Sequence, residues 1–289
     1  MNHSHFIVPP GKRIRLKDFD AGFTSHFESE EDAAAKLQED TGKLATYQDL
    51  LYAQRTYALL VILQGMDSAG KDGTIRHVMS GVNPQGTQVH SFKAPSAEEL
   101  DHDFLWRDTK VLPERGRVCI FNRSYYEEVL VVRVHPQLLE AQRLPPGALA
   151  KRPWKQRFEA INNFERHLVG NGTIILKFFL HLSRAEQRRR LLARIDAPEK
   201  NWKFSPGDVK ERAHWDDYMS AYEDALNQTS TDWAPWYIVP ADHKWFTRTV
   251  VADVIVSRLK SLKLAYPGLS SAGRRALLKA RKLLEADSG

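Results

Sequence analysis

The sequence has a single cysteine, Cys119, and this scarcity excludes several classes of protein. One cysteine cannot form an internal disulfide, so the fold does not depend on the oxidised framework of small secreted domains. Cys119 lies within an apolar run, residues 118–121, where a thiol is expected to act as a small hydrophobic side chain rather than a nucleophile. These features indicate a reducing compartment, and we expect a cytoplasmic protein.

Long hydrophobic runs, metal motifs and nucleic-acid-binding signatures are also missing. The longest apolar stretch, residues 57–63, is far too short to cross a bilayer, and the N-terminal residues show no signal-peptide segment. The 11 histidines show no metal-ligand spacing, and no helix-turn-helix or RNA-recognition motif is present. We therefore expect neither a membrane protein nor a nucleic-acid-binding protein.

Positive charge is in modest excess. The 289 residues include 42 Lys+Arg and 36 Asp+Glu, which gives a net charge of +6. An excess of basic over acidic side chains favours polyanionic ligands such as nucleotides or inorganic polyphosphate. Because residues 184–194 are rich in arginine, a non-catalytic polyanion-binding protein is one hypothesis.

Short apolar runs alternate with segments long enough for helices. Five of these runs have the composition of strands: residues 58–64, 87–93, 117–122, 173–181 and 236–240. This alternation predicts right-handed βαβ crossovers and a mostly parallel sheet covered by helices on both faces. In such a sheet, ligands bind beyond the carboxyl ends of the strands.

The chain divides into three expected parts. We expect residues 1–27 to form a basic extended arm and residues 28–262 to form the main domain. Residues 263–289 are expected to form a basic C-terminal helix. We expect two helices within residues 28–56, broken near Gly42. The apolar side of the C-terminal helix is expected to pack against the body, although a membrane-binding role is the alternative.

The most informative segment is residues 58–74, which read ALLVILQGMDSAGKDGT. A strand-like run ends in the motif G-x-x-x-x-G-K, from Gly65 to Lys71, and helix-forming sequence follows. In such a phosphate loop the glycines let the backbone wrap around an anion, main-chain N–H groups point into the concavity, and the lysine adds a positive charge. The segment therefore predicts a phosphate-binding site.

One position departs from the usual motif. Asp72 follows Lys71, where most such loops have a serine or threonine that binds Mg²⁺. Asp67, inside the loop, is the candidate replacement for this missing ligand.

A second candidate segment follows the run at 117–122. P-loop phosphotransferases commonly have a metal-binding carboxylate where this chain has Asn122. The fork of donors on Arg123 suits a phosphate. Glu127 and Glu128 either supply the missing negative charge or form a solvated face.

Residues 184–214 predict a lid. The arginine-rich run is followed by Trp202 and Phe204, and Ser205-Pro206 has the form of a helix start. Two helices joined by a basic, aromatic turn can close over phosphates, bring arginines onto them and exclude water.

Together these segments resemble the polyphosphate kinase 2 family over most of residues 30–262. The shared motifs, in order, are GMDSAGKDGTIRHVMSGVNPQG, FNRSYYEEVLVVRVHP, DAPEKNWKFSPGDVKERAHWDDY and APWYIVPADHKWF. The resemblance implies an α/β, P-loop kinase-like fold with a helical lid and a five-stranded sheet. It also implies phosphoryl transfer that depends on Mg²⁺ or Mn²⁺, and a homo-oligomer, either a dimer or a tetramer.

The family's catalytic residues match positions of this sequence. The matches are Asp67, which is also the implied metal ligand, Lys71 and Arg123. Many members have Asp where this chain has Asn122, and the Asn form resembles the class that accepts both nucleoside mono- and diphosphates. Further phosphate or nucleotide contacts are expected at Gly65, Met66, Ser68, Ala69, Gly70, Asp72, Gly73, Lys93, Asn122, Tyr126, Glu127, Arg133, Arg188 and Arg194.

The preferred hypothesis is a polyphosphate-dependent nucleotide kinase. The resemblance implies reversible transfer of the terminal phosphate of inorganic polyphosphate to AMP, ADP or their guanine counterparts. An ATP-dependent nucleoside or nucleotide kinase on the same fold is the alternative, because the composition does not identify the phosphate donor.

Overall fold

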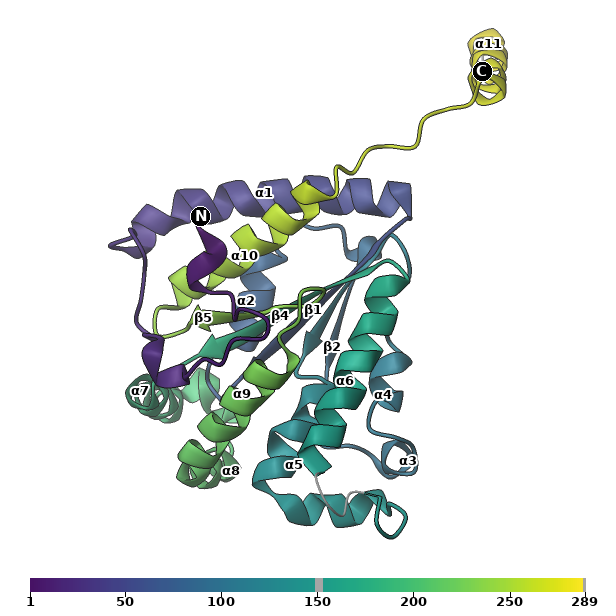
Figure 1. Ribbon diagram of the computed structural model, residues 1–289. Helices are drawn as coiled ribbons and strands as arrows, with labels where there is room; N and C mark the ends of the chain where they lie inside the picture. Colours follow the sequence, from purple (N-terminus) through teal and green to yellow (C-terminus); the bar gives the residue numbers. More distant parts are fainter. Residues whose placement is uncertain (149–152, 288–289) are drawn as a thin grey trace.

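The protein is described here by a computed structural model that covers residues 1–148 and 153–287. Its centre is a five-stranded sheet with the strand order β2-β3-β1-β4-β5, and every neighbouring pair is parallel (Figure 1). The strands are β1 (Ala58–Gly65), β2 (Thr87–Ser91), β3 (Val118–Asn122), β4 (Thr173–His181) and β5 (Trp236–Pro240). The five expected strands and the α/β architecture are thus confirmed, and the sheet is parallel throughout.

The central strand β1 is buried along its whole length. Leu59, Val61 and Leu63 pack into the core on one face of the sheet, and Leu60 and Ile62 pack into the core on the other. A parallel sheet between two helical layers requires apolar side chains on both faces, which explains the continuous apolar run.

Helices cover both faces of this sheet (Figure 1). One face carries α1 (Glu30–Gln54), α2 (Lys71–Val78) and α10 (Lys244–Ser261), and the other carries α5 (Val131–Val134), α6 (Pro153–Gly170) and α9 (Trp215–Thr229). The remaining helices are the short α3 (Ala97–Leu100) and α4 (Trp106–Thr109), then α7 (Arg184–Asp196), α8 (Pro206–Glu211) and α11 (Ser271–Ala286). Short 3₁₀ turns join several of them, among them η4 (Tyr125–Val129) and η6 (Pro198–Lys203). No helix in the described ranges is both long and apolar enough to span a membrane.

The expected break near Gly42 is wrong, because α1 continues from Glu30 to Gln54. A glycine inside a helix costs about 1 kcal/mol relative to alanine. Leu44 and Leu51 lie fully buried in the core that α1 shares with α10, and this packing outweighs the local preference.

The terminal segments differ in how they meet the body. Residues 6–8 run along β5, where Val8 N donates to Trp236 O at 2.9 Å and Ile238 N donates to Phe6 O at 2.7 Å. At the other end, α11 stands away from the body in Figure 1, and none of its residues is buried. Leu284 is 74% exposed, so the packing expected for this helix is wrong within the described chain.

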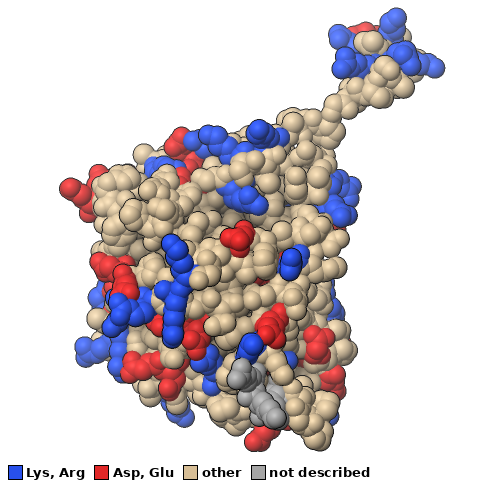
Figure 2. Space-filling model, viewed as in Figure 1, with Lys and Arg blue, Asp and Glu red and all other residues tan. Residues whose placement is uncertain are grey.

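The α11 helix also carries most of the net charge. Its surface in Figure 2 is mostly blue. The helix contains five cations and one carboxylate, which are Arg274, Arg275, Lys279, Arg281 and Lys282, and Glu285. Over the part of the body where Figure 1 places α7 and α8, positive and negative side chains are intermixed.

A buried ionic network joins α6 to the sheet. Lys177 of β4 donates to Glu165 of α6 at 2.6 Å, and both side chains are 0% exposed. Tyr125 and Tyr126 donate to the same carboxylate at 2.9 and 2.8 Å, and Lys177 also donates to Thr229 O at 2.7 Å. These extra hydrogen bonds satisfy a pair of charges whose burial is otherwise unfavourable.

Removing one member of this pair should destabilise the fold strongly. We expect Glu165→Ala to lower the free energy of unfolding by about 3–5 kcal/mol, because Lys177 would remain as an uncompensated buried charge. Chemical denaturation measures the loss. The control is Glu159→Ala on the same helix, since Glu159 forms an exposed pair with Lys155 and should cost no more than about 1 kcal/mol. Equal losses in the two variants would contradict this account.

Candidate active site

The loop between β1 and α2 has an unusual backbone. Gly65, Ser68 and Gly70 have φ values of 157°, 65° and 103°, in a region that residues other than glycine rarely occupy. A Cβ on Gly65 would lie 3.0 Å from Leu180 O and 3.1 Å from Ala69 Cβ, so β4 packs directly against the loop. Strained backbone of this kind is maintained only where surrounding contacts hold it.

Loop side chains are divided between the core and the site. Met66 is 7% exposed and Ala69 is 1% exposed, so both offer mainly their backbone to a ligand. Gly73, in the first turns of α2, has open space where a Cβ would be.

Lys71 is buried at the start of α2. Its Nζ donates to Gly65 O at 2.6 Å and to Met66 O at 3.3 Å. Burial lowers the pKa of Lys71, as does the nearby charge of Arg123, while Asp67 and Glu127 oppose this shift. The loop therefore surrounds a cation that is poorly solvated.

Arg123 lies opposite this lysine, at the end of β3. Its backbone has a φ of 65°, and its N–H donates to Leu63 O at 3.0 Å, which anchors it to β1. Its guanidinium donates to Asp67 at 2.9 Å and lies 3.8 Å from Glu127. The structure thus brings Asp67, Lys71, Arg123 and Glu127 together at the carboxyl ends of β1 and β3.

The carboxylate of Glu127 is only 17% exposed. Burial raises its pKa, and Arg123 and Lys71 act in the opposite direction. The sequence left the same two roles open for Glu127 and Glu128. Glu128 does not join the group around Arg123 and instead binds Arg157 at 2.8 Å.

Asn122 links the loop to the neighbouring strand. Its Nδ2 donates to Asp72 at 2.6 Å and to Ser91 of β2 at 3.4 Å. Its Oδ1 is buried and has no hydrogen-bond partner among the described residues.

The oxygen atoms at this edge suit a hard cation. Asp67, Glu127 and the unpartnered Oδ1 of Asn122 are the ligand types that Mg²⁺ prefers. Among residues 1–148 and 153–287, no group of three or more His, Cys, Asp or Glu side chains could hold a metal alone. Mg²⁺ is usually held by one or two carboxylates together with substrate phosphates, and Asp67 and Glu127 provide two carboxylates here.

The α7 helix packs directly on the phosphate loop. Gln187 Nε2 donates to Asp67 O at 3.0 Å, and Arg194 donates to Ser68 Oγ at 2.9 Å. Arg190 donates to Ser68 O at 2.9 Å. Sequence reasoning missed Gln187, because an uncharged side chain inside an arginine-rich run gives no signal of its own.

Arg188 lies on another side of the same helix. It is exposed and makes no ion pair within the part of the chain that the structure describes. The pKa of Arg212 is lowered by burial and by the charges of Arg184 and Arg188, so three cations gather here.

Two of the predicted ligand-binding residues, Tyr126 and Arg133, bind partners outside this group. Tyr126 is 0% exposed and its hydroxyl donates to Glu165, so the contact expected of it is not available in this structure. The guanidinium of Arg133 donates to Asp224 of α9 at 2.5 Å. Both lie in short helical turns between residues 125 and 134, in which some side chains point into the core and others do not. The sequence did not show on which side each of the two residues lies.

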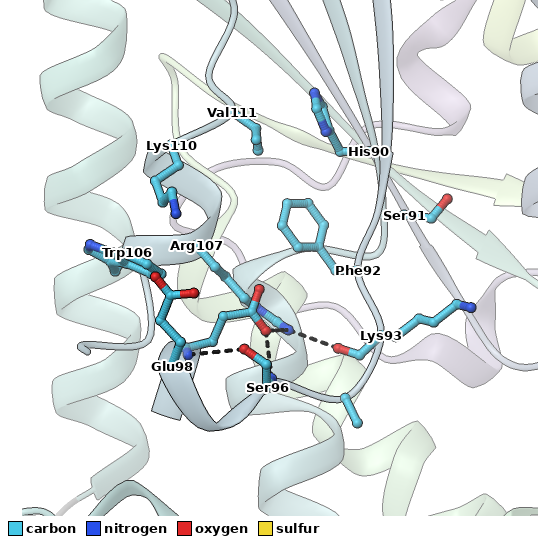
Figure 3. Close-up of a pocket in the computed structure, with 12 residues that line it drawn as sticks. His90, Ser91, Phe92, Lys93, Ser96, Glu98, Trp106, Arg107, Lys110 and Val111 are labelled. Carbon is cyan, nitrogen blue, oxygen red and sulfur yellow. Dashed lines mark hydrogen bonds and ion pairs between the residues drawn. The ribbon is translucent and has the colours of Figure 1, made fainter. Parts of the chain in front are cut away.

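Lys93 lies at a pocket of about 420 Å³ beyond the end of β2 (Figure 3). Its carbonyl oxygen accepts a hydrogen bond from Arg107 at 2.8 Å. Figure 3 shows its side chain pointing away from Trp106 and from the guanidinium of Arg107. Ser91 connects this pocket to the loop through its contact with Asn122.

Asp108 is a further residue that sequence reasoning missed. Its Oδ1 accepts a hydrogen bond from Tyr125 N at 2.9 Å and so holds the backbone two residues after Arg123. Burial raises the pKa of this carboxyl to about 7, and Arg107 acts in the opposite direction. Its Oδ2 is buried and has no hydrogen-bond partner within residues 1–148 and 153–287, although Arg107 Nε lies 3.8 Å from it.

The fold and the loop define a P-loop kinase-like α/β protein, and comparison with known proteins gives its family. The model of the polyphosphate kinase 2 family matches residues 27–266. The chain therefore belongs to this family, as its motifs indicated.

Relatives resemble the chain over nearly its full length. An ADP-polyphosphate phosphotransferase of Rhodopseudomonas palustris is 53% identical, with 96% of this chain and 97% of the relative covered. An AMP/ADP-polyphosphate phosphotransferase of Meiothermus ruber is 45% identical, with 94% and 98% covered. The crystal structure of polyphosphate kinase 2 from Arthrobacter aurescens TC1 superposes with a TM-score of 0.84 at 41% identity, covering 96% of each chain.

Asp108 makes the stability of the fold depend on pH. Its pKa is raised on folding, from the ordinary value of 3.8 to about 7, so the native state binds more protons than the unfolded state between these values. The corresponding stability is present at low pH and lost as the pH rises through 7. We expect Asp108→Asn to leave stability unchanged near pH 4 and to increase it by up to about 4 kcal/mol at pH 8. Denaturation at both pH values tests this, and a variant effect independent of pH would contradict it.

Proposed function

We propose that this protein transfers the terminal phosphate of inorganic polyphosphate to AMP or ADP, or to the guanine counterparts. The observation that carries the proposal is the convergence of Lys71, Arg123 and Asp67 at a phosphate loop in a chain of this family. The names of the two relatives favour polyphosphate over ATP as the phosphate donor.

The chemistry needs positioning more than acid–base catalysis. The terminal phosphoanhydride P–O bond of polyphosphate breaks, a P–O bond to the nucleotide's terminal phosphate oxygen forms, and the shortened polyphosphate leaves with the electron pair. The acceptor oxygen is already anionic, so no general base is required. Lys71, the loop N–H groups and Arg123 would bind the equatorial oxygens of the transferred group, where charge is spread in the transition state.

We further propose Mg²⁺, replaceable by Mn²⁺, as the cofactor. Asp67 would hold it, with Glu127 and the Oδ1 of Asn122 as nearby oxygen donors. When bound, the ion would neutralise charge on the phosphate oxygens. Asp67 now contacts Arg123, so ligand binding would redistribute these contacts.

Three wider features complete the proposal. Residues 184–214 would act as a lid over the phosphates; Arg194 already contacts the loop at Ser68, and the exposed Arg188 would contact polyphosphate from the solvent side. The chain would form homo-oligomers, dimers or tetramers, as the family resemblance implies. A reducing, cytoplasmic location suits Cys119, whose thiol is buried and whose pKa burial raises to about 12.

The direct test supplies ADP, Mg²⁺ and polyphosphate without another donor and measures ATP formation. We expect turnover by the natural sequence and a loss of roughly 10²-fold or more in Lys71→Met and Asp67→Asn, because each removes charge stabilisation at the transferred group. Asp67→Asn should still bind polyphosphate.

Arg281→Gln is the matched control, since Arg281 lies on α11, away from the site, and pairs with Glu285 in its own helix. It should keep the activity of the natural sequence. Turnover that requires ATP would instead indicate an ATP-dependent kinase. Salt-sensitive polyphosphate binding without any turnover would indicate a non-catalytic binding protein.

A further inference from the structure

Arg190 differs from its neighbours on α7. It is 7% exposed, whereas Arg188 and Arg189 are exposed. A buried guanidinium is costly unless its donors are all satisfied and its charge is balanced. The contacts of Arg190 meet both conditions.

On one side, Arg190 holds the phosphate loop. Its Nη1 donates to Ser68 O at 2.9 Å and to Ala69 O at 3.2 Å. A Cβ on Gly70 would lie 3.7 Å from the same nitrogen. Because the C=O and N–H of a trans peptide point in opposite directions, fixing Ala69 O also fixes the direction of the Gly70 N–H.

On the other side, Arg190 holds the turn between β5 and α10. Its Nη2 donates to Ala241 O at 2.6 Å and to Asp242 O at 2.9 Å. Its Nε donates to Glu186 at 2.7 Å, which balances the charge. A guanidinium has five N–H donors, and all five therefore have an acceptor.

We propose that Arg190 is a positioning residue that fixes the peptide groups of the phosphate loop in their anion-binding orientation by tying them to residues 241–242. It acts through the loop and does not itself contact the transferred phosphate. None of its donors is free for a ligand in this arrangement. Within the lid of residues 184–214, the part of α7 around Gln187 and Arg190 would then stay fixed, and only the part beyond Arg190 would move.

The kinetic part of this proposal rests on the proposed function, so the test includes a readout that does not. Hydrogen exchange of the backbone, followed by mass spectrometry, reports the loop directly. We expect Arg190→Lys, which keeps the charge but loses the five-donor fork, to speed exchange at residues 65–72 and 241–243 by about tenfold or more. Exchange at residues 118–122 should not change.

The same variant should lower kcat by about 10²-fold while the KM for ADP changes less than about threefold, because a loop misplaced by about 1 Å loses transition-state contacts. The double variant Glu186→Gln/Arg190→Met removes both charges, leaves no unpaired buried ion, and should show the same two effects. Arg189→Gln is the matched control, because Arg189 binds the same Glu186 but not the loop. It should match the natural sequence in both readouts.

Unchanged exchange in Arg190→Lys, or equal effects in Arg189→Gln, would overturn the proposal. A rise in the KM for polyphosphate with kcat unchanged would also overturn it, since Arg190 would then be a phosphate contact. If the natural sequence shows no polyphosphate-dependent turnover but the exchange pattern is as expected, the positioning role stands and the proposed function fails.

Discussion

The phosphate loop concentrates positive charge in a place with little solvent, and the surrounding structure serves to hold it there. Lys71 is 8% exposed and bonded to two carbonyl groups of its own loop. Arg123 approaches from β3, and the negative charges nearest to both are Asp67 and Glu127. A phosphate bound here would replace the present partners of Lys71 and Arg123, and the surrounding contacts would then hold both charges in place, so that little reorganisation is needed during the reaction.

Several layers of contacts maintain this arrangement. Gly65 allows β4 to pack against the loop, and Asn122 joins the first turn of α2 to β2. Behind the site, the Glu165–Lys177 network fixes the segment that follows Arg123, since Tyr125 and Tyr126 both donate to Glu165. The buried ion pair of the core therefore helps to position Arg123, because it holds the backbone segment that follows this residue.

The sequence predicted the strands and the phosphate loop because their signals are local. The pattern of apolar residues, the length of the apolar run and the spacing of the glycines are enough to place β1 and the turn that follows it. The continuity of α1 through Gly42 was not predictable, because it depends on packing against α10. The burial of Tyr126 likewise depends on Lys177, a residue 51 positions away. Arg188 and Arg190 are two positions apart, about 200° around a helix, so only the packing of α7 shows that one faces solvent and the other the loop.

We propose that Lys71 and Arg123 hold one phosphoryl group between them. A crystal structure of the chain with Mg²⁺, ADP and a non-hydrolysable polyphosphate analogue tests it most directly. We expect a phosphate unit within hydrogen-bond distance of Lys71 Nζ, the loop N–H groups and the Arg123 guanidinium, with Lys71 released from Gly65 O. Phosphates bound elsewhere, with Lys71 still donating to Gly65 O and Met66 O, would contradict it.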